Sequence, residues 1–333
     1  MARNRSFAVL GAGSWGTALA LQLARTDHEV HLWGHLESEI NPLIADRENK
    51  FYLPGCPLPD NITATTNLGL AIANSRDILI VVPSHVLRIV LEQIKPLLRE
   101  KQRVNWATKG FELDSGLLPH QVVNVVLGKG HQGCVISGPT FAKEVGAGLP
   151  SALTIASEDK KLAKRIAKQM SNDHFRAYTS KDITGVEIGG AVKNVIAIAA
   201  GGCDGLGFGV NARVAVITRG LAEIMRLGKK MGAKPTTFMG LSGMGDLVLT
   251  CSDNQSRNRR MGLALSAGKG IEEAQKEIQQ VVEGVQAAKA VHQMATKLGI
   301  EMPITEQVYK VIYENLAPQE AFQNLMSREL GKE

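Results

Sequence analysis

Short apolar segments alternate with longer stretches of helical periodicity through the first half of the chain. Residues 77–82 (DILIVV) are apolar after the first position, which is typical of a strand covered on both faces. The same reasoning predicts strands at 6–10, 29–33, 103–107 and 133–137, and helices at 17–25 and from His85 onward. Continuous apolar strands separated by helices predict an α/β domain built on a parallel sheet.

The pattern changes near Asp182, where helical periodicity replaces the strands. Helices are predicted at 183–200, 212–231, 262–267, 271–279, 285–298 and 304–315. Pro303 suits the first turn of the last of these, because its missing N–H would have no partner there. We therefore predict an α/β domain of residues 1–185 followed by an all-helical domain of residues 186–333.

Composition is that of an ordinary globular protein, with 44% hydrophobic and 21% charged residues in 333. The net charge of +6 is spread along the chain, so it fits anionic small molecules or weak nucleic-acid affinity and decides neither. No apolar run approaches the roughly 18 residues of a membrane span. A cytoplasmic protein is expected.

Four cysteines lie far apart, at positions 56, 134, 203 and 251. No Cys-x-x-Cys pair and no Cys/His spacing typical of a metal site occurs among them. The sequence predicts free thiols and no metal centre.

Residues 9–17 read VLGAGSWGT, which places Gly11, Gly13 and Gly16 between the first strand and the first helix. In that context Gly11 permits the tight turn, Gly13 lets a pyrophosphate approach the backbone, and Gly16 allows close packing of helix and strand. The pyrophosphate would lie at the helix N-terminus. The motif predicts a Rossmann-like dinucleotide-binding fold, and the alternative is a glycine turn kept for packing.

The second strand ends in HLWGHLES, where an NAD-specific fold would place an acidic residue for the ribose hydroxyls. Gly34 and His35 occupy that place, and Glu37 follows. The missing carboxylate removes repulsion against a 2′-phosphate, which His35 could bind. This favours NADPH, with NADH still possible.

Polar residues follow three further predicted strands. Ser84 follows the strand at 77–82, Lys109 follows 103–107, and Thr140 follows 133–137. Because ligands of doubly wound sheets bind at the carboxyl ends of the strands, we expect these side chains at one edge of the sheet. A solvated lysine is the alternative interpretation of Lys109.

Lys193 is the only charged residue in IGGAVKNVIAIAAGGC (188–203). Gly189 and Ala197, one turn away on each side, give it a small, close-packed helix face. Burial disfavours the ammonium form, so Lys193 is a candidate acid–base group, and Asn194 could orient a substrate or water. A lysine whose stem merely packs is equally compatible with this stretch.

A second glycine-rich segment, GLSGMGD (240–246), is expected to be a flexible loop ending in Asp246. Downstream, Arg257, Arg259 and Arg260 form a basic cluster with Ser256 and Asn258 interleaved. The planar guanidinium fork suits a phosphate. The alternative is a solvated basic helix start, and no aromatic platform supports nucleic-acid binding.

At this point the chain resembles the bacterial NAD(P)-dependent glycerol-3-phosphate dehydrogenases, the soluble enzymes that supply sn-glycerol 3-phosphate to phospholipid synthesis. The matching segments are GAGSWGTALA (11–20), VVPSH (81–85), ATKG (107–110), SGPTFAKE (137–144), GGAVKNVIAIAAG (189–201), NARVAVITRGLAE (211–223), GDLVLTC (245–251), NQSRNRR (254–260), VVEG (281–284) and MPIT (302–305). They run from end to end of the sequence.

The resemblance implies roles for individual residues. It makes Lys193 the proton acceptor, and it assigns substrate to this lysine together with Lys109, Gly138, Thr140, Asp246, Ser256, Arg257 and Asn258. It assigns the dinucleotide to Ser14, Trp15, His35, Lys109, Ala142, Arg257, Val281 and Glu283, beside the glycines of the turn. It also implies a homodimer.

The mechanism implied is hydride transfer from NADPH to the C2 carbonyl of dihydroxyacetone phosphate, with Lys193 supplying the proton. Two alternatives remain open from the residues. One is a two-domain dehydrogenase of the 3-hydroxyacid or 6-phosphogluconate type, which differs in its substrate. The other is a non-catalytic NADPH sensor, which would bind the cofactor without turnover.

Overall fold

The computed structural model describes residues 6–329, so the ends of the two predicted domains, 1–5 and 330–333, lie outside the described residues. The chain divides into two compact units. Unit 1 comprises residues 1–109 and 118–183, and unit 2 comprises 110–117 and 184–333. The segment 110–117, inside the first predicted domain, therefore groups with the helical unit.

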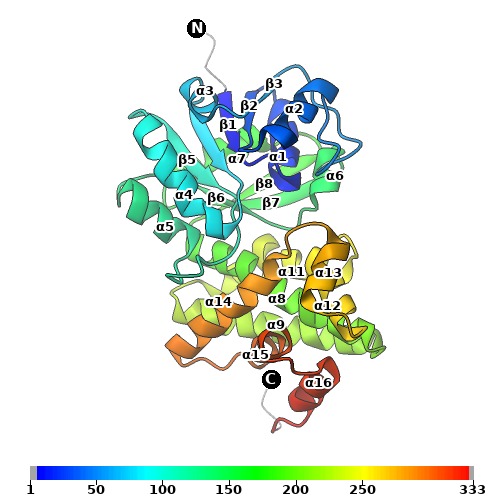
Figure 1. Ribbon diagram of the computed structural model, residues 1–333. Coiled ribbons are helices and arrows are strands. Elements are labelled where there is room, and N and C mark those ends of the chain that lie inside the picture. Colours follow the sequence, from blue (N-terminus) through cyan, green and yellow to red (C-terminus); the bar gives the residue numbers. More distant parts are fainter. Residues whose placement is uncertain (1–5, 330–333) are drawn as a thin grey trace. The chain divides into compact units, whose positions relative to one another are not determined.

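Unit 1 is built on an eight-stranded sheet in the order β3-β2-β1-β4-β5-β6-β7-β8 (Figure 1). The strands are β1 (Ser6–Leu10), β2 (Glu29–Trp33), β3 (Ile62–Thr65), β4 (Asp77–Ile80), β5 (Arg103–Trp106), β6 (Val135–Ser137), β7 (Ser151–Ala156) and β8 (Phe175–Ser180). All neighbours are parallel except β6 and β7, which are antiparallel. The predicted α/β fold with a largely parallel, Rossmann-like sheet is confirmed.

The five predicted strands are all present, two of them at the predicted bounds and three one or two residues shorter. The strands β3, β7 and β8 are not among those predicted from the sequence. Both β3 (ITAT) and β8 (FRAYTS) are edge strands that carry exposed polar residues, so they lack a continuous apolar run.

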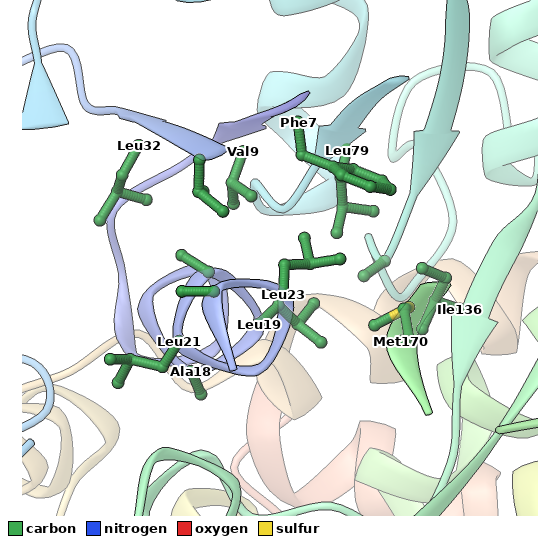
Figure 2. Close-up of a cluster of buried hydrophobic side chains, with 14 of the residues drawn as sticks. Phe7, Val9, Ala18, Leu19, Leu21, Leu23, Leu32, Leu79, Ile136 and Met170 are labelled. Atoms are coloured by element: carbon green, nitrogen blue, oxygen red, sulfur yellow. The ribbon is translucent and has the colours of Figure 1, made fainter. Parts of the chain in front are cut away.

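Seven α-helices of unit 1 pack around this sheet. They are α1 (Ser14–Ala24), α2 (Glu37–Asp46), α3 (Leu68–Ala73), α4 (Ser84–Ile94), α5 (Pro119–Leu127), α6 (Ala142–Gly146) and α7 (Lys160–Met170), with a 3₁₀ turn η1 (Lys95–Leu97) after α4. Helix α1 is buried along nearly its whole length because it lies beneath the strands. Figure 2 shows Leu19 and Leu23 of α1 facing Val9 and Leu79 of the sheet.

Unit 2 is helical, as the sequence predicts (Figure 1). Its helices are α8 (Ile183–Gly205), α9 (Gly209–Lys230), α10 (Pro235–Phe238), the π-helical turn η2 (Leu241–Gly245), α11 (Asp246–Ser252), α12 (Arg257–Ser266), α13 (Ile271–Ile278), α14 (Glu283–Leu298), α15 (Pro303–Tyr313) and α16 (Pro318–Met326). Pro303 occupies the first turn of α15, as predicted.

Two details of unit 2 differ from the expectations. Residues 240–246 are not a flexible loop: 241–245 form the π-helical turn, and Asp246 is the buried first residue of α11. Gly243 explains the tight local path, because a Cβ there would lie 2.2 Å from the carbonyl oxygen of Phe238. The helix predicted at 262–267 begins at Arg257, one residue after its cap.

Helix α8 is 23 residues long and holds an 18-residue window of mean hydropathy 1.4, so by length and composition alone it could span a membrane. The expectation that no run approaches that length is therefore wrong. Inside the protein, 83% of its apolar window is buried, which is the pattern of a core helix. Glycines let α12 approach it closely: a Cβ on Gly262 would lie 2.0 Å from the Ile198 carbonyl oxygen.

Candidate active site

The glycine turn after β1 has three distinct local geometries. Gly11 has φ +121°, and a Cβ there would lie 2.3 Å from the Val81 carbonyl oxygen. A Cβ on Gly16 would lie 1.8 Å from the carbonyl oxygen of Gly11 itself. At Gly13, by contrast, a Cβ would meet nothing within 4 Å. The fold therefore requires glycine at positions 11 and 16. At Gly13 the space beside the backbone is open, and we call this space the glycine cradle.

The start of α1 has the properties of an anion site. Its N-cap is Gly13, which offers no side-chain acceptor, so the first-turn N–H groups remain available to a ligand. Trp15 Nε1 is buried and finds no hydrogen-bond partner among the described residues. Ser14 is engaged, because its hydroxyl donates to the Tyr52 carbonyl at 2.7 Å. The open cradle and the orphaned indole N–H fit a dinucleotide at this turn.

The end of β2 carries no acidic residue at the expected place. Gly34 packs against α2, where a Cβ would lie 2.5 Å from Ile40 Cδ1. His35 is exposed directly after it, and Glu37 is the exposed first residue of α2. The first side chain after β2 is therefore the imidazole of His35 and not a carboxylate.

The other strand exits lie side by side, because β4, β5 and β6 are consecutive in the sheet and parallel to one another. The Thr108 hydroxyl donates to the Val82 carbonyl at 2.8 Å, which ties the first two exits together. Lys109 is half-buried after β5, and Ser84 begins α4. The sequence prediction that these groups share one edge of the sheet agrees with this order.

The third exit, after β6, is a compact turn. The Thr140 hydroxyl donates to the Gly138 carbonyl at 3.2 Å. Gly138 is buried against β7, since a Cβ there would lie 2.8 Å from the Leu153 Cα. Ala142 begins α6, whose last carbonyls accept hydrogen bonds from Arg25 at the end of α1. This turn is therefore anchored to the same helix that opens at the glycine cradle.

In unit 2, Lys193 is buried in the middle of α8 and forms an ion pair with Asp246. Its ammonium also donates to the Thr250 hydroxyl at 2.9 Å, one turn along α11. These partners offset the cost of burying a charge. Lys193 is therefore a buried, paired lysine inside the helical unit and not a solvated surface lysine.

Burial raises the pKa of the neighbouring Cys251 thiol to about 12, although the Lys193 charge acts in the opposite direction. A thiol of that pKa stays protonated at neutral pH. Cys251 is therefore not the nucleophile of this site. All four cysteines are free and buried, and residues 6–329 contain no group of three His, Cys, Asp or Glu side chains that could hold a metal.

The first turns of α12 and α14 meet beside Lys193. Asn194 Nδ2 donates to Glu283 at 3.3 Å, and the Gly284 N–H donates to Asn258 Oδ1 at 2.8 Å. Val281 is exposed two residues before α14. Two helix N-termini are therefore held against the same stretch of α8, and their dipoles make this region attractive to an anion.

The basic cluster predicted at 257–260 separates into different roles. Ser256 is the N-cap of α12, where its Oγ accepts the Arg259 N–H at 3.2 Å. The Arg259 guanidinium is buried and paired with Asp204, so it is not available to a phosphate. Arg257 and Arg260 are half-buried near one another, and burial followed by the Arg257 charge lowers the pKa of Arg260.

The structure adds two residues to those predicted for this region. Thr250 contacts Lys193, and its only sequence signal is its i+4 spacing from Asp246 on one helix. Asp204 pairs with arginines from two other helices, and nothing in the local sequence indicates this.

Comparison with known proteins gives matches over nearly the whole chain. Residues 6–163 match the family model of the N-terminus of NAD-dependent glycerol-3-phosphate dehydrogenase, and residues 182–323 match that of its C-terminus. The glycerol-3-phosphate dehydrogenase (NAD(P)+) of Psychromonas ingrahamii is 54% identical over 329 residues, covering 98% of each chain. That of Shewanella halifaxensis is 52% identical over 334 residues, covering 100% of this chain and 98% of the relative.

Solved structures give the same result. The glycerol-3-phosphate dehydrogenase of Coxiella burnetii superposes with a TM-score of 0.95 at 46% identity, covering 97% of this chain and 99% of that one.

Proposed function

This chain belongs to the NAD-dependent glycerol-3-phosphate dehydrogenase family, and we propose that Lys193 is the acid–base group of its reaction. The reaction is reversible hydride transfer between NAD(P)H and dihydroxyacetone phosphate, which gives sn-glycerol 3-phosphate. Membership of this family sets aside the 3-hydroxyacid and 6-phosphogluconate alternatives and the non-catalytic sensor. The single observation that carries the proposal is the buried Lys193–Asp246 pair with Thr250 as its third member.

The glycine turn is the proposed place for the dinucleotide. Gly11 and Gly16 shape it, Gly13 leaves room for the pyrophosphate, and Trp15 offers an unused buried donor. When bound, the reduced nicotinamide supplies the hydride. The exposed His35 in place of a carboxylate supports NADPH as the preferred cofactor.

Lys193 is proposed to give its proton to the oxygen on C2 as that oxygen gains negative charge, and to take it back in the oxidative direction. Asp246 and Thr250 would keep the ammonium aimed in one direction, because each holds one of its N–H groups. Lys109 is proposed to contact both cofactor and substrate, as the family resemblance implies. Gly138, Thr140 and Ala142 are proposed to line the turn after β6 for the same ligands.

The phosphate of the substrate is proposed to lie at the first turn of α12, with Arg257, Asn258 and the Ser256 cap. Support comes from the two helix N-termini that meet beside α8 and from the half-buried guanidinium of Arg257. Holding the phosphate fixes the distance from C2 to Lys193, which lowers the entropic part of the barrier. Val281 and Glu283, at the start of α14, are proposed to face the cofactor.

The test follows the absorbance of the reduced nicotinamide as the purified protein meets dihydroxyacetone phosphate, with NADPH and NADH run in parallel. We expect rapid oxidation, faster at low concentrations of NADPH than of NADH. Binding of NADPH without oxidation by this ketone would contradict the proposed function.

In the cell, we propose that this activity supplies sn-glycerol 3-phosphate to glycerophospholipid synthesis in the cytoplasm, with the protein acting as a homodimer. The bacterial relatives named above and the core position of α8 support this setting. Light scattering of the purified protein tests the dimer, because a mass near 36 kDa in place of twice that value would contradict it.

A further inference from the structure

Asp204, near the end of α8, lies between arginines from two other helices of unit 2. Its Oδ2 accepts Arg213 Nη1 of α9 at 2.7 Å and Arg259 Nη2 of α12. The side chains of Asp204 and Arg259 are only 12% and 10% exposed. A single shielded carboxylate therefore joins three helices.

Arg259 transmits this contact to the first turn of α12. Its Nη1 donates to Asn254 Oδ1 in the preceding loop, and its backbone N–H donates to the Ser256 cap. The residue is thus bound to α8, to the loop and to the cap at once. Arg257 and Asn258, the proposed phosphate ligands, belong to the same turn.

Close packing and hydrogen bonds both hold α12 against α8. Gly201 lets the α12 backbone lie directly on α8, since a Cβ there would be 2.0 Å from the Arg259 carbonyl oxygen. Such dispersion contacts have little directionality, and the hydrogen bond from Ser266 Oγ to the Gly202 carbonyl at 3.0 Å joins the two helices only at the other end of α12. A guanidinium that donates through two different nitrogens is directional, because its donors have fixed angles.

Arg213 gives Asp204 a second cationic partner. Its Nη1 lies 2.7 Å from the same Oδ2, and its side chain is 22% exposed, so it is less shielded than Arg259. Arg213 belongs to the segment NARVAVITRGLAE, which marks the family resemblance but holds none of the proposed ligands.

We propose that Asp204 and Arg259, with Arg213 as the second cation, are positioning residues that set where Arg257 and Asn258 meet the phosphate of the substrate. The inference rests on the proposed function, because it concerns the phosphate site of that function. Asp204 itself is not proposed to touch a ligand. It acts through the orientation of the first turn of α12.

The experiment is steady-state kinetics of the full chain carrying Asp204→Asn. We expect the KM for dihydroxyacetone phosphate to rise on the order of 10- to 100-fold, the range that a displacement of about 1 Å can produce. The kcat should change by less than about threefold, and the KM for NADPH by less than about twofold. Asp77→Asn is the matched control, because Asp77 is also a buried carboxylate paired with an arginine, the half-buried Arg165 of α7 in unit 1. It should lower Tm without raising the KM for the ketone.

A double-mutant cycle with Arg257→Met separates positioning from general destabilisation. If Asp204 acts through this turn, Asp204→Asn should add less than about twofold to the KM of Arg257→Met. A full additional rise, or an equal rise in the KM for NADPH, would overturn the positioning role.

The same cycle distinguishes failure of the proposed phosphate site from failure of the positioning role alone. If Arg257→Met alone leaves the KM for the ketone unchanged, the phosphate site is wrong and the positioning role falls with it. If Asp204→Asn does not fold, Arg259→Lys takes its place in the cycle, because it keeps the charge and loses the fork. Its predicted outcomes are the same.

Discussion

Lys193 and Asp246 are 53 positions apart in the sequence, yet their side chains form an ion pair in which they are 9% and 2% exposed. Each comes from a different helix of unit 2, α8 and α11. A pair this shielded contributes little net stability, because desolvation offsets the attraction. A chemical role explains this pair at the centre of the unit better than a contribution to folding does.

The first prediction concerns the proton. Lys193→Met should lower kcat by about 10²- to 10⁴-fold, the usual contribution of a positioned general acid. NADPH should still bind, because the glycine turn belongs to unit 1. Stopped-flow oxidation of NADPH and fluorescence titration measure the two quantities. Turnover within tenfold of the unmodified protein would exclude Lys193 from the proton transfer.

The second prediction concerns its partner. Asp246→Leu should destabilise the fold by about 3–5 kcal/mol, because it leaves a buried ammonium without its carboxylate. The double variant with Lys193→Met should recover much of this loss, since no charge is then left unpaired, while activity stays absent. Urea denaturation of the three variants gives the values. Additive losses in the double variant would show that the two residues do not interact.

The fold could be predicted from the sequence wherever an element is buried, because burial requires apolar residues at regular spacing. The strands β1 and β2 were predicted to the residue because they are buried and apolar or bounded by turns. The edge strand β8 was missed because most of its residues are exposed or partly exposed, so no apolar pattern selects it. The division of function between residues 1–185 and 186–333 stays a prediction.

The site could be predicted less completely, because its contacts join distant segments. Three arginines at 257–260 look equivalent in the sequence, and only the position of Asp204 distinguishes Arg259 from the others. The segment ending at Asp246 resembles a loop in the sequence because of its glycines, although one of them, Gly243, permits a close approach to Phe238 in the π-helical turn. The ligand roles of the individual residues also stay predictions.

The third prediction concerns cofactor preference. His35→Asp should place a carboxylate at the position that binds ribose hydroxyls in NAD-specific folds. Repulsion against the 2′-phosphate should then lower kcat/KM for NADPH relative to NADH by about tenfold or more, which corresponds to about 1.4 kcal/mol. His35→Ala is the control for simple loss of the imidazole. An unchanged ratio in His35→Asp would mean that the adenosine ribose lies elsewhere.

The fourth prediction concerns Glu223, which is buried on α9 and caps α15. Its carboxylate accepts the N–H groups of Ile304 and Thr305 at 2.6 and 3.2 Å and the Thr305 hydroxyl at 2.9 Å. Burial raises the pKa of this carboxyl, and the hydrogen bonds only partly oppose it. Its contribution to stability is therefore fully present below the unfolded pKa of about 4.3 and is lost as pH rises through the folded pKa.

Glu223→Gln should lower the free energy of unfolding by about 1–3 kcal/mol, because the N–H₂ group of the new amide would face backbone N–H donors. The Tm gap between the two proteins should be widest near pH 4.5 and narrow toward pH 7. Glu306→Gln, which removes a partly exposed pair with Lys310 on α15, should show only a small gap. A gap for Glu223→Gln that widens with pH would mean that the pKa is lowered instead.

The last prediction uses two glycines of one turn as each other's control. Gly16→Ala forces a Cβ to within 1.8 Å of the Gly11 carbonyl oxygen, so the backbone of the turn must move. We expect a loss of at least about 3 kcal/mol in the free energy of unfolding, since rigid backbone offers no room to repack.

Gly13→Ala is the matched variant. Its Cβ meets no atom within 4 Å, and the φ of −75° at Gly13 suits any residue, so Tm should stay within about 2 °C. The added methyl group would instead occupy the cradle proposed for the pyrophosphate, and the KM for NADPH should rise at least about tenfold with little change in the KM for the ketone. If Gly13→Ala binds NADPH normally, the cofactor does not approach this turn as proposed, whereas a large loss of Tm in that variant would mean that Gly13, too, is required by the fold.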